Sequence, residues 1–136
     1  MEARQVIDRT QIVYELLTAA SPLATVIGDR AWNPVAHRSW NGTQKAIVFH
    51  QDGSDSHITG ATNSAQFVFK CYGGDNTYTS SRVLFGLLYD RLQMASETVA
   101  SGTIFTARLQ SDNMLPPEPD TKYKAHMARF LINFEG

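Results

Sequence analysis

The densest group of side chains capable of chemistry lies in the run His50-Gln51-Asp52-Gly53-Ser54-Asp55-Ser56-His57. Two imidazoles and two carboxylates within this run are ligand types that zinc and other divalent ions take in proteins. The spacing fits neither a zinc finger nor an EF-hand loop, because the carboxylate series and the closing glutamate are missing. Asp-Gly and Ser-Asp-Ser are also ordinary turn sequences. We therefore expect a polar arm here and no metal site.

Nucleophilic catalysis needs a serine or cysteine beside a histidine that an acid orients. No serine lies in a Gly-x-Ser-x-Gly elbow, and the single cysteine, Cys71, falls in a strand-like run where a small buried residue is expected. Gly73-Gly74-Asp75-Asn76 precedes a helix but lacks the lysine of a P-loop, so we expect Asp75 or Asn76 to cap that helix. The sequence predicts no catalytic residue, no metal and no cofactor, and hence no enzyme.

Composition narrows the class of protein further. The 136 residues carry a formal net charge of −1, with acidic and basic residues scattered along the chain. This balance gives no electrostatic reason to bind nucleic acid or an anionic membrane directly. A single cysteine suits a reducing compartment, and no apolar stretch approaches the ~20 residues that span a bilayer. We expect one domain over residues 1–136 that is soluble and not secreted.

Three helices are expected from the spacing of apolar residues. Residues 2–20 repeat apolar side chains at helical spacing. A short second helix should begin at Ser21 as N-cap with Pro22 in its first turn, and end at Gly28. A third should run to about residue 95, with Val83 on its inner face together with the neighbouring leucines. Gly86 in its middle suggests close packing there, since glycine costs about 1 kcal/mol against alanine.

Strands are expected where apolar residues alternate or form short runs, at residues 44–50, 65–72, 102–111 and 123–134. The first two should pair as an antiparallel hairpin joined by the polar arm of residues 51–64. Residues 30–33 are strand-like until Pro34, and residues 112–121 form an extended, proline-rich linker. The fold class is therefore α+β, with an antiparallel sheet of about four strands. Two main helices should pack on one face of it, with the short helix following the first.

Two further observations concern surfaces. Trp40, flanked by polar residues in a loop, is expected at an interface, because large amphipathic rings dominate interface energetics. Arg108 and Arg129 lie within the two late strands and should turn away from the helices. A solvated sheet face and a face that lines a ring or contacts a subunit explain these two arginines equally well.

The chain as a whole resembles the tail-completion, or tail-terminator, proteins of long-tailed bacteriophages and related prophages. The resemblance covers nearly all of the chain as a pattern of elements, including the opening helix, the loop carrying Pro34 and the leucine-rich helix. The stretches that carry it are Val26-Ile27-Gly28-Asp29-Arg30, Ala46-Ile47-Val48-Phe49, Phe67-Val68-Phe69-Lys70-Cys71-Tyr72 and Phe130-Leu131-Ile132-Asn133-Phe134. The chain departs from the pattern at Trp40-Asn41-Gly42, where a short apolar and proline entry into the next strand is expected.

The resemblance implies a structural virion protein that assembles as a hexameric ring. Such a ring caps the head-proximal end of the tail tube, ends tail growth and docks to the head–tail connector protein. Its partners are then other copies of itself, the tail tube protein and the connector, with no membrane. Genomic DNA passes through the hole without sequence-specific binding. The ring assembles in the host cytoplasm and stays in the tail or neck of the virion.

In such a ring the two polar segments should reach neighbouring subunits or the tube. The candidate contact residues are Trp40, Asp52, Asp55, His57, Ile58, Asn113, Leu115 and Glu118. A head–tail connector or minor tail protein of related fold remains an alternative. From another class, so does a small α+β module that binds a ligand, or a small enzyme.

Overall fold

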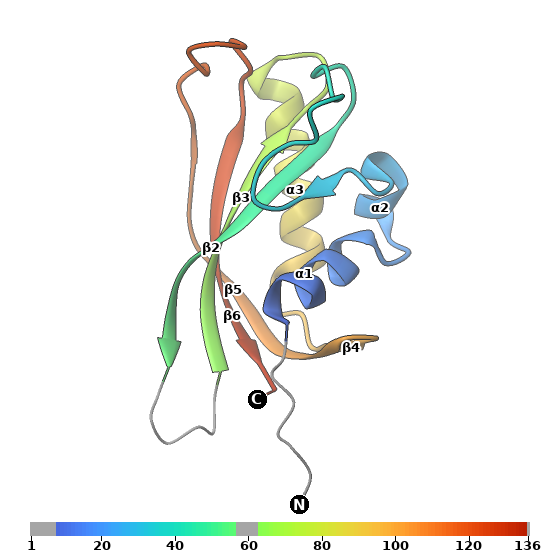
Figure 1. Ribbon diagram of the computed structural model, residues 1–136, viewed down its shortest axis with the longest axis vertical. Helices are drawn as coiled ribbons and strands as arrows, with labels where there is room; N and C mark the ends of the chain where they lie inside the picture. The colour runs from blue at the N-terminus through green and yellow to red at the C-terminus, as the bar shows by residue number, and fades with distance from the viewer. Residues whose placement is uncertain (1–7, 57–62, 136) are drawn as a thin grey trace, which may run out of the picture.

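The computed structural model describes residues 8–56 and 63–135, and it shows an α+β fold with one curled sheet (Figure 1). The helices are α1 (Arg9–Thr18), α2 (Pro22–Ile27) and α3 (Tyr78–Leu92). The strands are β1 (Ala31–Trp32), β2 (Ala46–Ser56), β3 (Asn63–Tyr72), β4 (Glu97–Val99), β5 (Gly102–Met114) and β6 (His126–Phe134). They lie in the order β1-β2-β3-β6-β5-β4.

Local sequence explains where the first two helices begin and end. Asp8 caps α1, its side chain accepting a hydrogen bond from the Gln11 amide at 3.1 Å. Ser21 caps α2 in the same way, accepting from the Ala24 amide at 3.2 Å, with Pro22 as the first helical residue. Gly28 follows with a φ of +59°, a backbone conformation that glycine adopts without strain. The expected cap, proline and stop of α2 are confirmed.

The sheet has six strands, so the expected count of about four was wrong. The β2–β3 hairpin is confirmed as antiparallel, and β3, β6 and β5 continue the antiparallel order. The additional strands are β1, of 2 residues and parallel to β2, and β4, of 3 residues and paired with β5. β1 lies within residues 30–33, which were expected to be strand-like but were not counted in the sheet. β4 is too short to carry a readable alternation of apolar and polar residues, so the sequence pattern missed it.

The two polar segments are more regular than expected. Instead of a long arm after residue 50, β2 continues to Ser56 and β3 begins at Asn63, with a register shift between Gln51 and Ser54. The start of β3 also pairs with the end of β6, at Asn63 opposite Phe134. Likewise β5 continues three residues beyond its expected end at Ser111, to Met114. Backbone ladder bonds thus order segments whose side chains are polar.

All three helices cover the same face of the sheet (Figure 1). Their buried residues join the inward side chains of β1, β2, β3, β5 and β6 in one core, where phenylalanine rings pack against one another with centroids 5.7 to 6.4 Å apart. The phenylalanines of this core are Phe49, Phe67, Phe69, Phe130 and Phe134. Cys71 is fully buried in it, as expected, and burial raises the pKa of its thiol.

Two details of α3 correct the expectations. Its N-cap is Thr77, whose side chain accepts from the Ser80 amide at 3.2 Å, whereas Asp75 lies two residues earlier and accepts hydrogen bonds from the hydroxyls of Thr77 and Ser80. These hydrogen bonds hold the pKa of Asp75 below its ordinary value. Val83 faces outward, with 59% of its surface exposed, and a Cβ at Gly86 would meet no atom within 4 Å. The expected close packing at Gly86 is therefore wrong.

Candidate functional site

The face of the sheet opposite the helices is divided into two halves. In one half, residues 33–45 and 115–125 cover a small apolar cluster built on Val48, Tyr72 and Ala125. Trp40 lies in this cluster, with its ring centroid 5.1 Å from Tyr72 and 5.2 Å from Tyr123. Its indole N–H donates to the Gln44 carbonyl at 3.0 Å. The packing of Trp40 within its own chain is thus explained without a partner.

The proline-rich segment after β5 is bonded to the body of the protein. Tyr72 donates its hydroxyl hydrogen to a Glu118 carboxylate oxygen at 2.5 Å, and Tyr78 donates to the Leu115 carbonyl at 2.5 Å. The Lys124 amide donates to the Asn76 side chain at 2.8 Å. Burial, and then the bonded Glu118 carboxylate, raise the pKa of Tyr72. Leu115 and Glu118, expected as partner contacts, hold this segment in place.

The other half of this outer face carries polar side chains that bond across the strands. Arg129 on β6 pairs with Asp52 on β2 at 2.7 Å, and both are partly exposed. A hydroxyl and amide chain joins Ser64, Asn133 and Thr106, with the Asn133 amide donating to the Thr106 hydroxyl at 2.7 Å. Asp52, another expected contact, therefore has a partner within the chain.

The remaining candidate residues are placed unevenly. Asn113 is exposed on β5, where its side-chain amide donates to the Met114 carbonyl at 3.2 Å. Asp55 lies in β2, where only its backbone is described, and His57 and Ile58 lie outside the described residues. Within residues 8–56 and 63–135, no three His, Cys, Asp or Glu side chains gather as metal ligands would. The run of residues 50–57, singled out above for its histidines and carboxylates, lies mostly within β2.

Sequence reasoning missed a buried histidine. His126 Nε2 lies 2.7 Å from an Asp112 carboxylate oxygen, and the imidazole stacks on Phe85 of α3 with centroids 4.6 Å apart. The buried Nδ1 atom has no hydrogen-bond partner in the part of the chain that is described. Ser81, the buried hydroxyl of the same helix, donates to backbone carbonyls instead. The sequence did contain a clue: His126 and Phe130 lie an even number of positions apart on β6, so both side chains lie on the buried face of the sheet.

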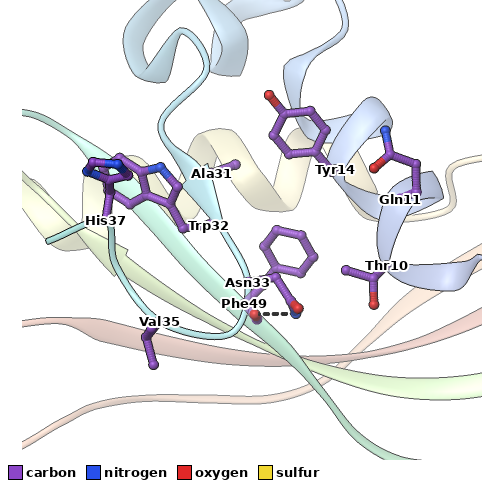
Figure 2. Close-up of a pocket in the computed structure, with 9 residues that line it drawn as sticks. All are labelled: Thr10, Gln11, Tyr14, Ala31, Trp32, Asn33, Val35, His37 and Phe49. Atoms are coloured by element: carbon purple, nitrogen blue, oxygen red, sulfur yellow. Dashed lines mark hydrogen bonds between the residues drawn. The ribbon is translucent and has the colours of Figure 1, made fainter.

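A hollow of about 430 Å³ opens between α1, the loop after β1, and β2 (Figure 2). Aromatic side chains from three elements line it: Tyr14 from α1, Trp32 from β1 and Phe49 from β2. Thr10 and Gln11 on the first turn of α1 form a polar part of its wall. The described residues that line it are Thr10, Gln11, Tyr14, Ala31, Trp32, Asn33, Val35, His37 and Phe49.

The hollow lies where the parallel β1–β2 ladder stops. The Ile47 amide donates to the Arg30 carbonyl at 3.0 Å, and in this register the Phe49 carbonyl would next accept from the backbone amide of residue 34. That residue is Pro34, which has no N–H. The side-chain amide of Asn33 donates to the Phe49 carbonyl instead, at 2.7 Å (Figure 2). The ladder ends here, and the chain turns away from β2.

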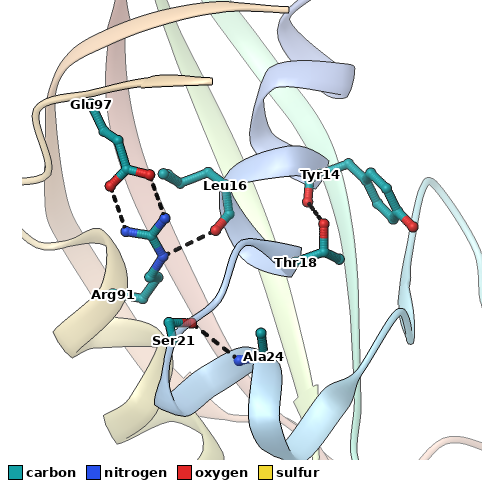
Figure 3. A network of polar contacts seen from close by, with 7 residues as sticks. All are labelled: Tyr14, Leu16, Thr18, Ser21, Ala24, Arg91 and Glu97. Carbon is teal, nitrogen blue, oxygen red and sulfur yellow. Dashed lines mark hydrogen bonds and ion pairs between the residues drawn. The ribbon is translucent and has the colours of Figure 1, made fainter. Parts of the chain in front are cut away.

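An arginine on α3 joins α1, the helix that walls the hollow, to α3 and β4. Arg91 on α3 binds both carboxylate oxygens of Glu97 on β4, at 2.9 and 2.7 Å (Figure 3). Its third donor, Nε, reaches the Leu16 carbonyl on α1 at 3.0 Å. Hydrogen bonds from Arg91 lower the pKa of Glu97. One guanidinium thus joins two helices and an edge strand.

Comparisons with known proteins concern the fold. Neither a known protein family nor a curated protein matches the sequence. In three dimensions the chain is similar to a chain of a solved structure described as the virion of a native gene transfer agent (GTA) particle. The TM-score is 0.72 over 94% of this chain and 95% of that chain, at 18% sequence identity. Among the described helices, none is both long and apolar enough to cross a membrane.

Proposed function

We propose that this chain is a structural subunit of a phage-like virion, and that it forms the ring that caps the head-proximal end of the tail tube. The observation that supports this most is the similarity in fold to a chain of the gene transfer agent virion, which spans nearly the full length of both chains. A ring subunit needs surfaces that bind copies of itself, and capping a tube requires no chemical reaction.

The margins of the sheet support a contact between unlike surfaces. On one side β1 pairs only with Ile47 and Val48, so no described strand lies beside the rest of β2. On the other side β4 pairs only with Gly102 to Ile104, and no described strand lies beside the far half of β5. Two different surfaces on opposite sides of one subunit make head-to-tail contacts, which close into a ring when the rotation permits.

The test is assembly of the full-length protein. We expect sedimentation to give a mass several times that of the 15.1 kDa chain, and negative-stain images to show rings, six-fold by our proposal. Addition of the ring to growing tubes of the cognate tail tube protein should stop elongation at one end. A chain that stays monomeric both alone and with the tube protein would contradict the proposal.

Two alternatives are separated by related measurements. A head–tail connector of the same fold would bind the head side and leave tube elongation unchanged. A small ligand-binding module is favoured by the hollow, whose volume falls within the usual range for small-molecule sites. The module would remain monomeric at high concentration, and a ligand recovered from it by mass spectrometry would raise its melting temperature.

A further inference from the structure

We propose that the Met114 side chain of one copy inserts into the hollow between α1 and β2 of the next copy. This inference rests on the ring proposed above and names the side chain and the receiving site of its subunit contact. The occupant is thus a second copy of this chain. Three observations carry it: the face on which Met114 lies, its level along the strands, and the chemistry of the hollow.

Met114 is a large apolar side chain left exposed at the open margin of the sheet. It ends β5 with 55% of its surface accessible. Its paired residue on β6 is His126, which is buried on the helix side of the sheet. Because directly paired residues point to the same face, Met114 also lies on the helix side. The α1 wall of the hollow, with Thr10, Gln11 and Tyr14, lies on that same side.

Met114 and the hollow also lie at one level, on opposite margins of the sheet. Residues that pair directly between neighbouring strands form rows across the sheet. The rows that begin on β2 beside the hollow end on the last residues of β5. A second copy placed beside the first, without a shift along the strands, therefore brings its Met114 to the hollow. The two rows of paired residues are Met114–His126–Cys71–Ile47 and Asp112–Ala128–Phe69–Phe49.

The hollow suits an unbranched thioether. Its aromatic walls are Tyr14, Trp32 and Phe49, and sulfur–aromatic contacts are favourable. Among the described residues, no aspartate, glutamate, lysine or arginine lines it, so an uncharged side chain enters without leaving one of these charges unpaired. Methionine also adapts its shape to irregular space, which fits a hollow bounded by three different elements.

Met94 provides a matched control on the same side of the subunit. It is also an exposed methionine, with 66% of its surface accessible, and its amide donates to the Ala107 carbonyl of β5 at 2.7 Å. The row of paired residues through Ala107 reaches β2 at Ser54, via Ile132 and Ala65. That is five residues beyond Phe49, or roughly 16 Å along the strand at ~3.3 Å per residue. Met94 therefore misses the hollow.

The first experiment compares assembly of the full chain by sedimentation velocity over a concentration series. We expect Met114→Glu to raise the dissociation constant of the ring at least tenfold, and Met94→Glu to change it less than twofold. Thermal melts should show both variants folded, because both side chains are exposed. Equal assembly by the wild type and Met114→Glu would overturn the inference and leave the ring standing.

The second experiment traps the contact. Gln11→Cys and Met114→Cys, placed on separate chains and mixed under mild oxidation, should form a disulfide-linked dimer, since Gln11 lies on the wall of the hollow. Cys71 is fully buried and should remain reduced. Either variant alone provides the control and should give at least tenfold less linked product. Rings without cross-linking would refute this contact, whereas a wild type that never assembles would refute the proposed function itself.

Discussion

Arg91 binds both carboxylate oxygens of Glu97 and, through its Nε atom, the Leu16 carbonyl, so that one side chain joins α3, β4 and α1. We expect Arg91→Ala to lower the free energy of unfolding by about 1–2 kcal/mol, a value kept modest because Glu97 is partly exposed to solvent. Urea denaturation measures this. Arg91→Lys should recover only part of the loss, because an ammonium group lacks the planar fork. Full recovery with lysine would contradict the bidentate geometry.

The same pair predicts a dependence on pH. The pKa of Glu97 is lowered from its ordinary 4.5 by hydrogen bonds from Arg91. A carboxylate with a lowered pKa in the folded state adds stability that is present above the unfolded pKa and is lost as the pH falls through the folded value. We therefore expect the stability difference between wild type and Glu97→Gln to be constant near neutrality and to shrink below about pH 4.5. A difference that grows on acidification would contradict this.

Gly42 is predicted to be intolerant of a side chain. Its φ is +81°, and a Cβ there would lie 2.6 Å from the Tyr123 ring, which packs against Trp40. Gly42→Ala should lower the free energy of unfolding by about 2 kcal/mol, from backbone strain and from displacement of the ring. Tryptophan fluorescence should change as well, because the Tyr123 ring moves away from Trp40. An unaltered melting temperature would show that the loop rearranges freely.

Gly86 gives the opposite prediction. It lies inside α3, and an added Cβ would meet nothing within 4 Å. Gly86→Ala should therefore raise the free energy of unfolding by about 1 kcal/mol, the difference in helix propensity. Thermal and urea unfolding of the isolated chain both measure the effect. A loss of stability would indicate that the space beside α3 is filled in the folded protein.

Tyr72→Phe is expected to loosen the segment between β5 and β6. The variant removes the hydroxyl that donates to Glu118, at a cost of about 1 kcal/mol. Amide hydrogen exchange should accelerate at Leu115 and Glu118, whose N–H groups bond to carbonyls of the same segment. Tyr89→Phe, at an exposed position on α3, is the matched control. Equal exchange rates in the two variants would show that the hydroxyl does not hold the segment.

What the sequence could predict was set by local physics. Ser21, Pro22 and Gly28 act on their own helix, so the beginning and end of α2 followed from residue type alone. The alternation around Phe67 and Phe130 predicted their strands, because burial of one face leaves a period of two.

Features that depend on several distant elements were not predictable. The hollow needs α1, β1 and β2 to meet, and the His126–Asp112 pair depends on the register between β5 and β6. The candidate contacts Asp52, Leu115 and Glu118 proved to be bonded or packed within the chain, since residues distant in sequence provide their partners. The prediction of close packing at Gly86 was wrong because a glycine that lowers helix stability need not contact another element.

The end of β1 before Pro34 and the register shift in β2 after Gln51 affect how an isolated copy of the chain behaves at the margins of its sheet. Long, flat strand borders recruit one molecule after another into fibres. Here a register shift interrupts each open border, between Gln51 and Ser54 in β2 and between Leu109 and Ser111 in β5, so an isolated copy of the chain is a poor template for amyloid.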